Sequence, residues 1–222
     1  MKDLVTGYEL EPSDELMAAQ AFFFFIAGAD VSAYTMHFVL LELAGNLDIL
    51  QWLHDEIDNV FEKSVDQISF DDIENMKYLD MVMNEASRKY PTVGIIQRRC
   101  TKDTTLPIGQ VKIEKDVTVV IPVYAIHRDE RYYPNPELFD PERFSPENMS
   151  KIPKFSYLPF GEGNRSCLGA RFARLQVKVG LSWLLRYYTL KKRAYRPKYF
   201  EPSSFALRDT NARFHLIPRR KV

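Results

Sequence analysis

A long proline-free stretch, residues 13–45, constrains the fold of this chain more than any other feature. Ser13 is a suitable N-cap and is followed by two acidic residues, which the positive end of a helix dipole favours. Gly45 supplies a natural stop at the other end. A helix of this length measures about 45–50 Å. A compact globule of 222 residues would be only about 45 Å across, so the predicted helix is as long as the whole protein.

The middle of this helix is apolar on every side. Phe22, Phe23, Phe24 and Phe25 follow one another at about 100° per residue and cover nearly the full circumference. The apolar run 17–29 is shorter than the ~20 residues that a membrane span needs, so we interpret it as a buried helix. The remaining residues look too few to surround it, which indicates that the chain belongs to a larger structure.

Composition excludes several classes of protein. Lys plus Arg and Asp plus Glu each number 30, and a formal net charge of zero argues against a nucleic-acid-binding protein. Two cysteines, Cys100 and Cys167, rule out a disulfide scaffold and a four-cysteine zinc site. They suit a reducing compartment in which one thiol has a function.

The rest of the chain mixes helices with short strands. A further helix is predicted over about 71–90 and must end before Pro91. The β-branched segment 117–126 predicts a strand, and a proline-dense, irregular stretch follows it. A last helix begins at about residue 168. The predicted fold class is mainly α with small β-sheets (α+β).

The segment FGEGNRSCLG carries the most chemical information. Cys167 lies at the start of a predicted helix, where the helix N-terminus and Arg165 both favour a thiolate. Gly163 and Gly169 let the backbone turn tightly and approach a flat partner, and Phe160 can shield the sulfur. A buried structural cysteine is the alternative. However, the pattern F-x-x-G-x-R-x-C-x-G should arise by chance only about once in ten thousand chains of this length.

Residues 160–169 resemble the haem-binding loop of the cytochrome P450 superfamily, the haem-thiolate monooxygenases. The resemblance implies that Cys167 is the axial thiolate ligand of the iron in haem b, whose electron donation favours O–O cleavage. It further implies that Arg165 pairs with a haem propionate through a charge-assisted bond. Arg98 is the expected second propionate contact, with the neighbouring Arg99 as the alternative.

Two other motifs agree with this family. The sequence around Glu85 and Arg88 resembles its E-x-x-R helix, in which residues i and i+3 share a face and can pair. The motif P-E-R-F resembles the family's irregular loop, whose arginine, here Arg143, completes the cluster. These three residues are assigned a structural role. The stretch around His127 resembles the animal microsomal branch, and His127 is expected to be a packing or hydrogen-bonding residue, not a metal ligand.

The segment AGADVS resembles the family's A/G-G-x-D/E-T-T/S pattern on the helix that crosses the oxygen side of the haem. By this resemblance, Ala27 and Gly28 leave room for dioxygen and substrate, and Asp30 helps to relay protons. The usual threonine is replaced by Val31, which has no hydroxyl group to donate or accept a hydrogen bond. Ser32 is about 100° further around the helix and cannot simply substitute. We therefore expect poorer coupling of electrons to product and more peroxide release.

The resemblance covers the chain from about residue 14 to its end. It predicts that residues 1–222 form the carboxy-terminal part of a single cytochrome P450 domain. This part would contain the long oxygen-side helix at 13–45, the E-x-x-R helix at about 71–90 and the haem-binding cysteine loop at 160–169.

The implied function is a haem-dependent monooxygenase that inserts one atom of O2 into an apolar organic substrate. NADPH electrons would come from a flavoprotein reductase docked on Arg171, Arg174 and Lys178. The implied location is the cytosolic face of the endoplasmic reticulum membrane, through a segment that this chain lacks. Two alternatives stay open. One is a truncated, non-catalytic protein with weak or no haem binding, and the other is a haem-thiolate isomerase that acts on peroxides without a reductase.

Overall fold

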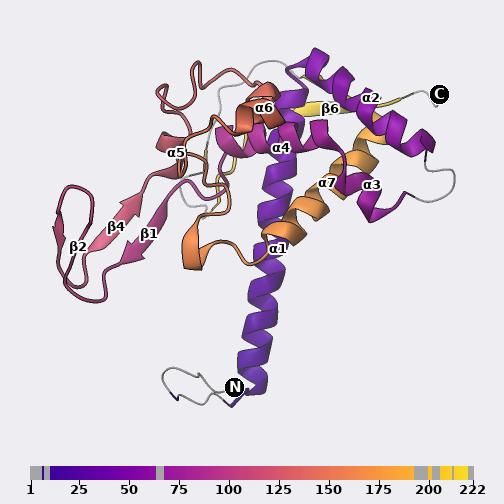
Figure 1. Cartoon of the computed structure of the whole chain (residues 1–222). Helices are drawn as coiled ribbons and strands as arrows, with labels where there is room; N and C mark the ends of the chain where they lie inside the picture. The colour runs from indigo at the N-terminus through magenta and orange to yellow at the C-terminus, as the bar shows by residue number, and fades with distance from the viewer. Residues whose placement is uncertain are drawn as a thin grey trace.

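Helix α1, Asp14–Leu43, runs along the whole molecule, and the other elements gather around its carboxy-terminal half (Figure 1). The computed structural model describes residues 7, 11–63, 68–192, 200–201, 206–211 and 213–219. The other helices are α2 Leu47–Lys63, α3 Phe70–Glu74, α4 Lys77–Lys89, α5 Val123–Ile126, α6 Pro146–Met149 and α7 Ala170–Tyr187, with 3₁₀ turns at Pro141–Phe144 and Gly163–Arg165. The strands are β1 Ile96–Arg99, β2 Thr104–Thr105, β3 Lys112–Ile113, β4 Thr118–Ile121, β5 Tyr188–Lys192 and β6 Phe214–Pro218.

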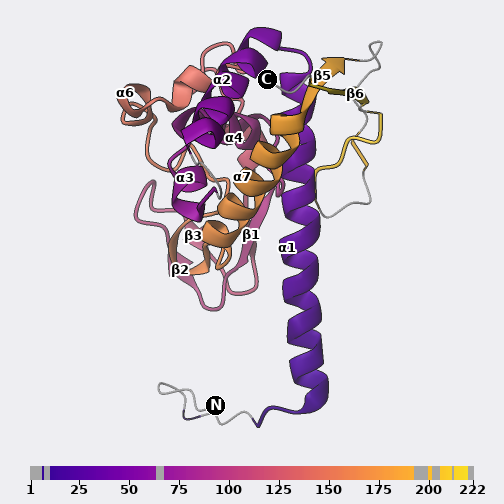
Figure 2. The same cartoon turned by 90° about the vertical axis from the view of Figure 1, so that its right-hand side faces the viewer.

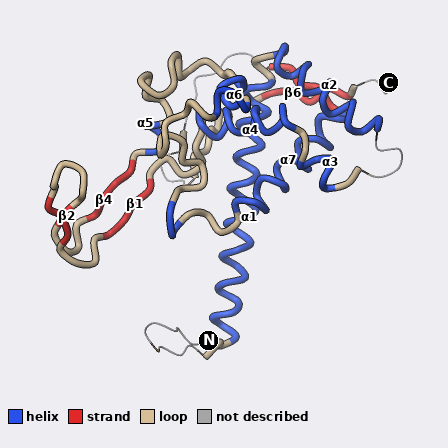
Figure 3. Tube along the Cα trace, viewed as in Figure 1, coloured by secondary structure: helices blue, strands red, loops and turns tan. Residues whose placement is uncertain are grey.

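The strands form two-stranded antiparallel sheets, so the predicted class, mainly α with small β-sheets, is confirmed (Figure 3). Ile96 pairs with Ile121 in the β1–β4 sheet, β2 pairs with β3, and β5 pairs with β6. The prediction of a strand over 117–126 is only half right. Pro122 has no N–H to extend the β4 ladder, and the chain turns there into α5.

The core lies where α1, α2, α4 and α7 meet (Figure 2). Each helix presents apolar side chains there that are almost fully buried, among them Val39, Leu43, Leu53, Ile57, Leu79, Val82, Leu181 and Leu185. Helix α7 lies directly against α1, since a Cβ atom placed on Gly180 would lie 2.7 Å from Met36 Sδ. This close packing holds the middle of α7 against α1.

The amino-terminal half of α1 is exposed, which corrects the prediction of a buried helix. Phe22, Phe23, Phe24 and Phe25 are between 59% and 72% exposed. The buried residues of α1 all lie between Ser32 and Leu43, where α4 and α7 pack against it. The length and apolar composition of α1 also meet the criterion for a membrane-crossing helix, as do those of many core helices.

The helix predicted over 71–90 is divided into α3 and α4. Met76 has the extended backbone angles of an N-cap, φ −67° and ψ 99°, but its side chain cannot accept a capping hydrogen bond. Glu56 of α2 takes over this role, because its two carboxylate oxygens accept the N–H groups of Tyr78 and Leu79, each at 2.8 Å. The break therefore depends on a contact with a distant helix, which the local pattern does not contain.

Candidate functional site

A cleft of about 1490 Å³ lies between α1 and the loop that precedes α7. This volume exceeds the roughly 300–1,000 Å³ of an ordinary small-molecule site. Most of the residues that the sequence assigned to the site line it: Ala27, Gly28, Val31, Arg98, Phe160, Arg165, Cys167 and Gly169. The structure therefore brings together residues that are up to 142 positions apart (27 and 169) around one space.

The cysteine loop holds its thiol in this cleft. The N–H of Cys167 donates to the carbonyl oxygen of Phe160 at 2.8 Å, which closes the loop. Gly161 and Gly163 have φ angles of +71° and +77°, a backbone region that other residues rarely adopt. Cys167 is a free, exposed cysteine three residues before the first residue of α7, Ala170. The loop thus presents an accessible sulfur at a helix N-terminus.

The glycines of the loop leave open space beside the backbone. A Cβ atom built on Gly163 or on Gly169 would meet no heavy atom within 4 Å. Gly169 lines the cleft, whereas Gly163 does not and serves the turn. A flat group can therefore approach the backbone at Gly169 without meeting a side chain.

Small and apolar residues of α1 form the opposite wall. Ala27, Gly28, Val31 and Ser32 lie three or four residues apart along the helix and so share the face that lines the cleft. Asp30 is exposed and is not among the lining residues, because it lies on a different face of the helix. The structure therefore places the predicted proton-relay residue outside this wall.

Hydroxyl groups near Val31 are already engaged with the protein. Ser32 Oγ donates to Gln176 Oε1 of α7 at 3.2 Å, and Thr35 Oγ1 donates to the carbonyl oxygen of Val31 at 3.0 Å. Gln176 and Phe172 of α7 also line the cleft, although neither was predicted as a site residue. Their spacing from Gly169, on one face of α7, is the signal that could have identified them.

Arg98 and Arg99 have different environments. Arg98 is exposed and lines the cleft. Arg99 is not a lining residue and instead pairs with Asp116 at 2.7 Å. Neighbouring residues of a strand point to opposite faces, which explains the difference. Arg98, not Arg99, is therefore the arginine of β1 that is available to a ligand.

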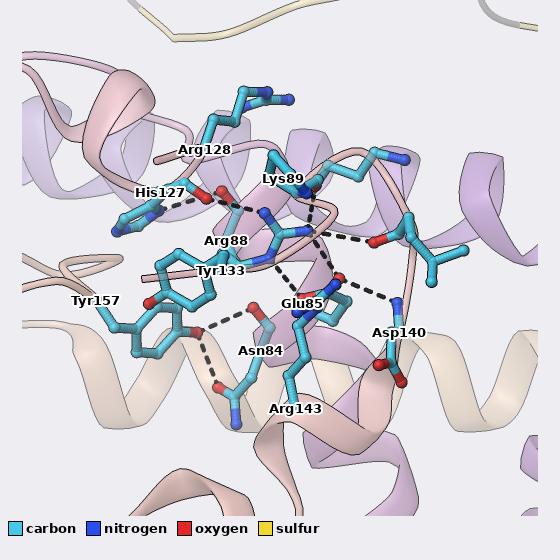
Figure 4. A network of polar contacts seen from close by, with 12 residues as sticks. Asn84, Glu85, Arg88, Lys89, His127, Arg128, Tyr133, Asp140, Arg143 and Tyr157 are labelled. Carbon is cyan, nitrogen blue, oxygen red and sulfur yellow. Dashed lines mark hydrogen bonds and ion pairs between the residues drawn. The ribbon is translucent and has the colours of Figure 1, made fainter. Parts of the chain in front are cut away.

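Glu85, Arg88 and Arg143 meet behind the cleft (Figure 4). Arg88 forms a two-pronged pair with Glu85, Nε to Oε2 at 2.7 Å and Nη2 to Oε1 at 2.8 Å, and both side chains are fully buried. Arg143 lies 3.6 Å from Glu85 Oε1 and donates to the carbonyl oxygens of Pro134 and Asn135. The cluster thus joins α4 to the irregular segment that precedes the cysteine loop.

Backbone groups complete this network. Arg88 Nη1 donates to the carbonyl oxygen of His127 at 2.8 Å and Nη2 to that of Pro136 at 2.7 Å, while the N–H of Asp140 donates to Glu85 at 3.0 Å. Burial raises the pKa of Glu85 above its ordinary value, and the hydrogen bonds and charge of Arg88 act against this effect. A buried pair needs such additional hydrogen bonds to offset its desolvation.

The three cationic residues predicted to dock a partner are not equivalent. Arg171 is exposed, and Arg174 places its guanidinium 5.4 Å from the ring centre of Phe160. Lys178 is only 2% exposed and donates to the carbonyl oxygen of Glu74 at 2.6 Å and to Asp80 at 2.9 Å. The prediction that Lys178 contributes to a docking surface is therefore wrong, because its amine is used inside the fold.

Comparison with known proteins agrees with this site. The family described as Cytochrome P450 matches residues 4–216. The chain is 45% identical over 180 residues to "Probable cytochrome P450 6a13" of Drosophila melanogaster. This match covers 81% of this chain and 36% of the relative. It is 40% identical over 216 residues to "Cytochrome P450 6B2" of Helicoverpa armigera, covering 96% of this chain and 43% of the relative. The chain spans about two fifths of the length of the curated relatives it matches.

The chain belongs to the cytochrome P450 family. Membership of this family implies a haem cofactor, and the residues of the cleft fit such a group. They supply one accessible thiol at Cys167, two exposed guanidinium groups at Arg98 and Arg165, and an open backbone at Gly169. Thiolate is a haem-iron ligand, and arginine is well suited to carboxylate groups.

Proposed function

We propose that this chain carries the haem-thiolate part of a monooxygenase that inserts one oxygen atom from O2 into an apolar organic compound. The observation that supports this most strongly is the exposed thiol of Cys167, which faces the small-residue wall of α1 across one cleft. A single thiol at a helix N-terminus, opposite a wall with room for small molecules, suits an axial metal ligand.

Each residue of the cleft has a defined task in this proposal. Cys167 would ligate the iron of haem b, and Arg165 and the N-terminus of α7 lie next to it. Arg98 and Arg165 pair with the two propionates. Bound haem supplies oxygen activation, and the electron-rich thiolate favours O–O cleavage. Phe160, which lies against the Arg174 guanidinium and lines the same cleft as Cys167, would help to shield the sulfur once haem is bound.

The opposite wall receives dioxygen and substrate. Ala27 and Gly28 leave space there, and Val31 adds an apolar surface without a hydroxyl group. Asp30, which lies outside the wall, would deliver protons through solvent or a neighbouring group. A substrate of mainly apolar character is supported by the many apolar lining residues, among them Phe23, Phe24, Phe25, Val93, Ile95 and Leu168.

Electrons are proposed to come from an NADPH-dependent flavoprotein reductase. Arg171 and Arg174 at the start of α7 remain candidate docking residues for an acidic partner surface. The proposed location is the cytosolic face of the endoplasmic reticulum membrane, which is supported by the sequence resemblance to the microsomal branch.

A carbon monoxide difference spectrum tests this function. The chain is supplied with haem, reduced with dithionite and exposed to carbon monoxide. A strongly red-shifted Soret band that disappears in the Cys167→Ser variant supports thiolate ligation. A band typical of histidine or water ligation, or no haem binding at all, would favour the alternative of a truncated, non-catalytic protein. The exposed phenylalanines of α1 are consistent with that alternative.

Val31 favours a second candidate, a haem-thiolate isomerase that rearranges peroxides without a reductase. Such chemistry needs no proton delivery to dioxygen, so the absence of a hydroxyl group at position 31 costs nothing. Conversion of an organic hydroperoxide to an isomer by the haem-loaded chain, with no NADPH or reductase present, would support it. Strict dependence on reductase would rule it out.

The Val31→Thr variant tests the role of this position in the monooxygenase. The added hydroxyl group supplies a hydrogen-bond donor and acceptor on the cleft wall. We expect a higher ratio of product formed to NADPH consumed and less peroxide. An unchanged ratio would show that Val31 does not limit coupling. Val111→Thr, at an exposed position that does not line the cleft, is the control for a general effect of the substitution.

A further inference from the structure

His127 lies at the junction of three segments that are far apart in the sequence. It follows α5, its side chain is fully buried, and it lies beside Arg88 near the end of α4 (Figure 4). It also contacts the backbone of Leu158, just before the cysteine loop. Its ring stacks on Tyr157 with a centroid distance of 5.5 Å and meets the edge of Tyr133 at 6.4 Å. A fully buried polar ring with defined neighbours on every side needs all of its hydrogen bonds satisfied.

Both ring nitrogens of His127 are engaged, and each with a backbone group. Nδ1 lies 3.1 Å from the carbonyl oxygen of Arg88, which can only accept, so Nδ1 carries the proton. Nε2 lies 2.8 Å from the backbone nitrogen of Leu158, which can only donate, so Nε2 accepts. One neutral tautomer satisfies both contacts, and a protonated ring cannot form the second.

The bond to Leu158 leads directly to the cysteine loop. The carbonyl oxygen of Leu158 accepts the N–H of Gly161 at 3.2 Å, and the carbonyl oxygen of Phe160 accepts the N–H of Cys167 at 2.8 Å. Leu158, Phe160 and Cys167 all line the cleft. A short path of hydrogen bonds therefore runs from α4 through His127 to the residue that carries the thiol.

We propose that His127 is a positioning residue, whose neutral imidazole clamps the backbone at Leu158 to α4 and thereby places the cysteine loop against the cleft. Arg88 reinforces the clamp from the other side, because its Nη1 donates to the carbonyl oxygen of His127 at 2.8 Å. The ring and the main chain of His127 thus bind the same residue of α4 in both directions.

The surroundings of His127 favour the neutral ring that this role requires. Burial and the positive charges of Arg88 and Arg128 lower the pKa of His127 to about 4, against the opposing effect of the hydrogen bond to Arg88. The other titratable groups near it are Glu85, paired with Arg88, and the phenols of Tyr133 and Tyr157. At neutral pH the ring is therefore uncharged and able to accept from Leu158.

Two variants separate the clamp from simple filling of space. His127→Asn keeps a polar group near the Nδ1 position but is too short to reach Leu158, whereas His127→Gln reaches the Nε2 position with a neutral acceptor. Amide hydrogen exchange at Leu158 reports the bond without haem. We expect about tenfold faster exchange in the Asn variant and a near-normal rate in the Gln variant. His215→Asn, on the exposed β6 strand, is the matched control and should change nothing.

The second readout is the carbon monoxide spectrum of the haem-loaded full chain. The Asn variant should lose a large fraction of the red-shifted, thiolate-ligated form, and the Gln variant should retain it. This readout rests on the proposed function, whereas the exchange measurement does not. Absence of a red-shifted band in the unchanged chain would therefore contradict the proposed haem-thiolate site. The exchange rate at Leu158 would then still test the proposed role of His127.

A measurement on the unchanged protein covers the case in which the Asn variant fails to fold. Nitrogen-15 NMR should show the Nδ1-protonated tautomer of His127 and a coupling across the hydrogen bond between its Nε2 and the Leu158 nitrogen. Absence of that coupling, or equal exchange at Leu158 in the Asn and Gln variants, would overturn the proposal.

Discussion

The buried cluster around Arg88 and the cysteine loop around Cys167 are close in the fold but differ in how their polar groups are satisfied. Arg88 is fully buried and donates to Glu85 and to the carbonyl oxygens of His127 and Pro136 (Figure 4). Cys167 is exposed, and open space surrounds the backbone of Gly169 beside it. The first region is completed by this chain's own atoms, whereas the second presents groups that suit a bound partner.

We expect the Arg88 cluster to contribute mainly to the stability of the fold and the cysteine loop mainly to ligand binding. A buried cluster of paired charges holds segments in place, and removing one member leaves an uncompensated charge. An exposed thiol and bare glycine backbone contribute little to folding and are available for ligation. The predictions below test this separation, beginning with the change that should affect stability most.

Substitution of Arg88 should have the largest effect. Arg88→Met leaves the carboxylate of Glu85 buried without its main partner and removes three contacts to main-chain oxygens. We expect a loss of about 3–5 kcal/mol in the free energy of unfolding, measured by urea denaturation. Arg131→Met, which removes an exposed pair with Asp129, is the control and should leave the midpoint unchanged. Equal effects of the two variants would contradict the comparison.

Acid should weaken the buried region through His127. The pKa of its ring is about 4 in the folded protein and near 6.5 when unfolded, because burial and nearby positive charges disfavour the proton. The unfolded chain therefore binds more protons between these values, and stability falls as pH drops from about 6.5 to 4. The total loss of unfolding free energy is about 3 kcal/mol and is complete below about pH 4. Above about pH 6.5 there is no loss.

The His127→Gln variant isolates this contribution. Its free energy of unfolding should depend less on pH between about 6.5 and 4 than that of the unchanged chain. Urea denaturation at a series of pH values provides the measurement. His37 and His54 also have lowered pKa values because of burial, so their acid dependence should persist in the variant. Identical pH profiles would show that His127 is not held neutral by its surroundings.

Substitution of Lys178 should have an intermediate effect. Its amine donates to the carbonyl oxygen of Glu74 and to Asp80, and it joins α7 to α3 and α4. We expect Lys178→Met to lower the free energy of unfolding by about 1–2 kcal/mol, since the bonded groups lose a charged donor. Arg171→Met, on the exposed side of α7, should leave stability unchanged. An unchanged free energy of unfolding in Lys178→Met would contradict this internal role of the amine.

Substitution of Cys167 should have the smallest effect on folding and the largest on chemistry. The side chain is exposed, so Cys167→Ser should change the free energy of unfolding of the haem-free chain by less than about 0.5 kcal/mol. The same variant should abolish the red-shifted band of the carbon monoxide complex. A strong destabilisation without haem would show that the loop is part of the folding core, as Arg88 is.

Local patterns were sufficient for much of the site. The spacing of Phe160, Arg165, Cys167 and Gly169 identified residues that line the cleft, because these positions are close in sequence and their chemistry is distinctive. The small-residue wall of α1, and Val31 at the position of a usual threonine, were predicted from the resemblance of AGADVS to the family's motif. The family and the fold class follow from the same patterns.

Contacts between distant segments were not readable in this way. The break between α3 and α4 depends on Glu56, and the burial of Lys178 depends on its bond to Asp80. The backbone position of Leu158 depends on its bond to His127. Each joins one side chain to a group at least 22 positions away, as in the bond from Tyr78 to Glu56, so no local periodicity signals it. Residue type and spacing specify which groups can bond and where helices run, but the packing of the helices selects the partners.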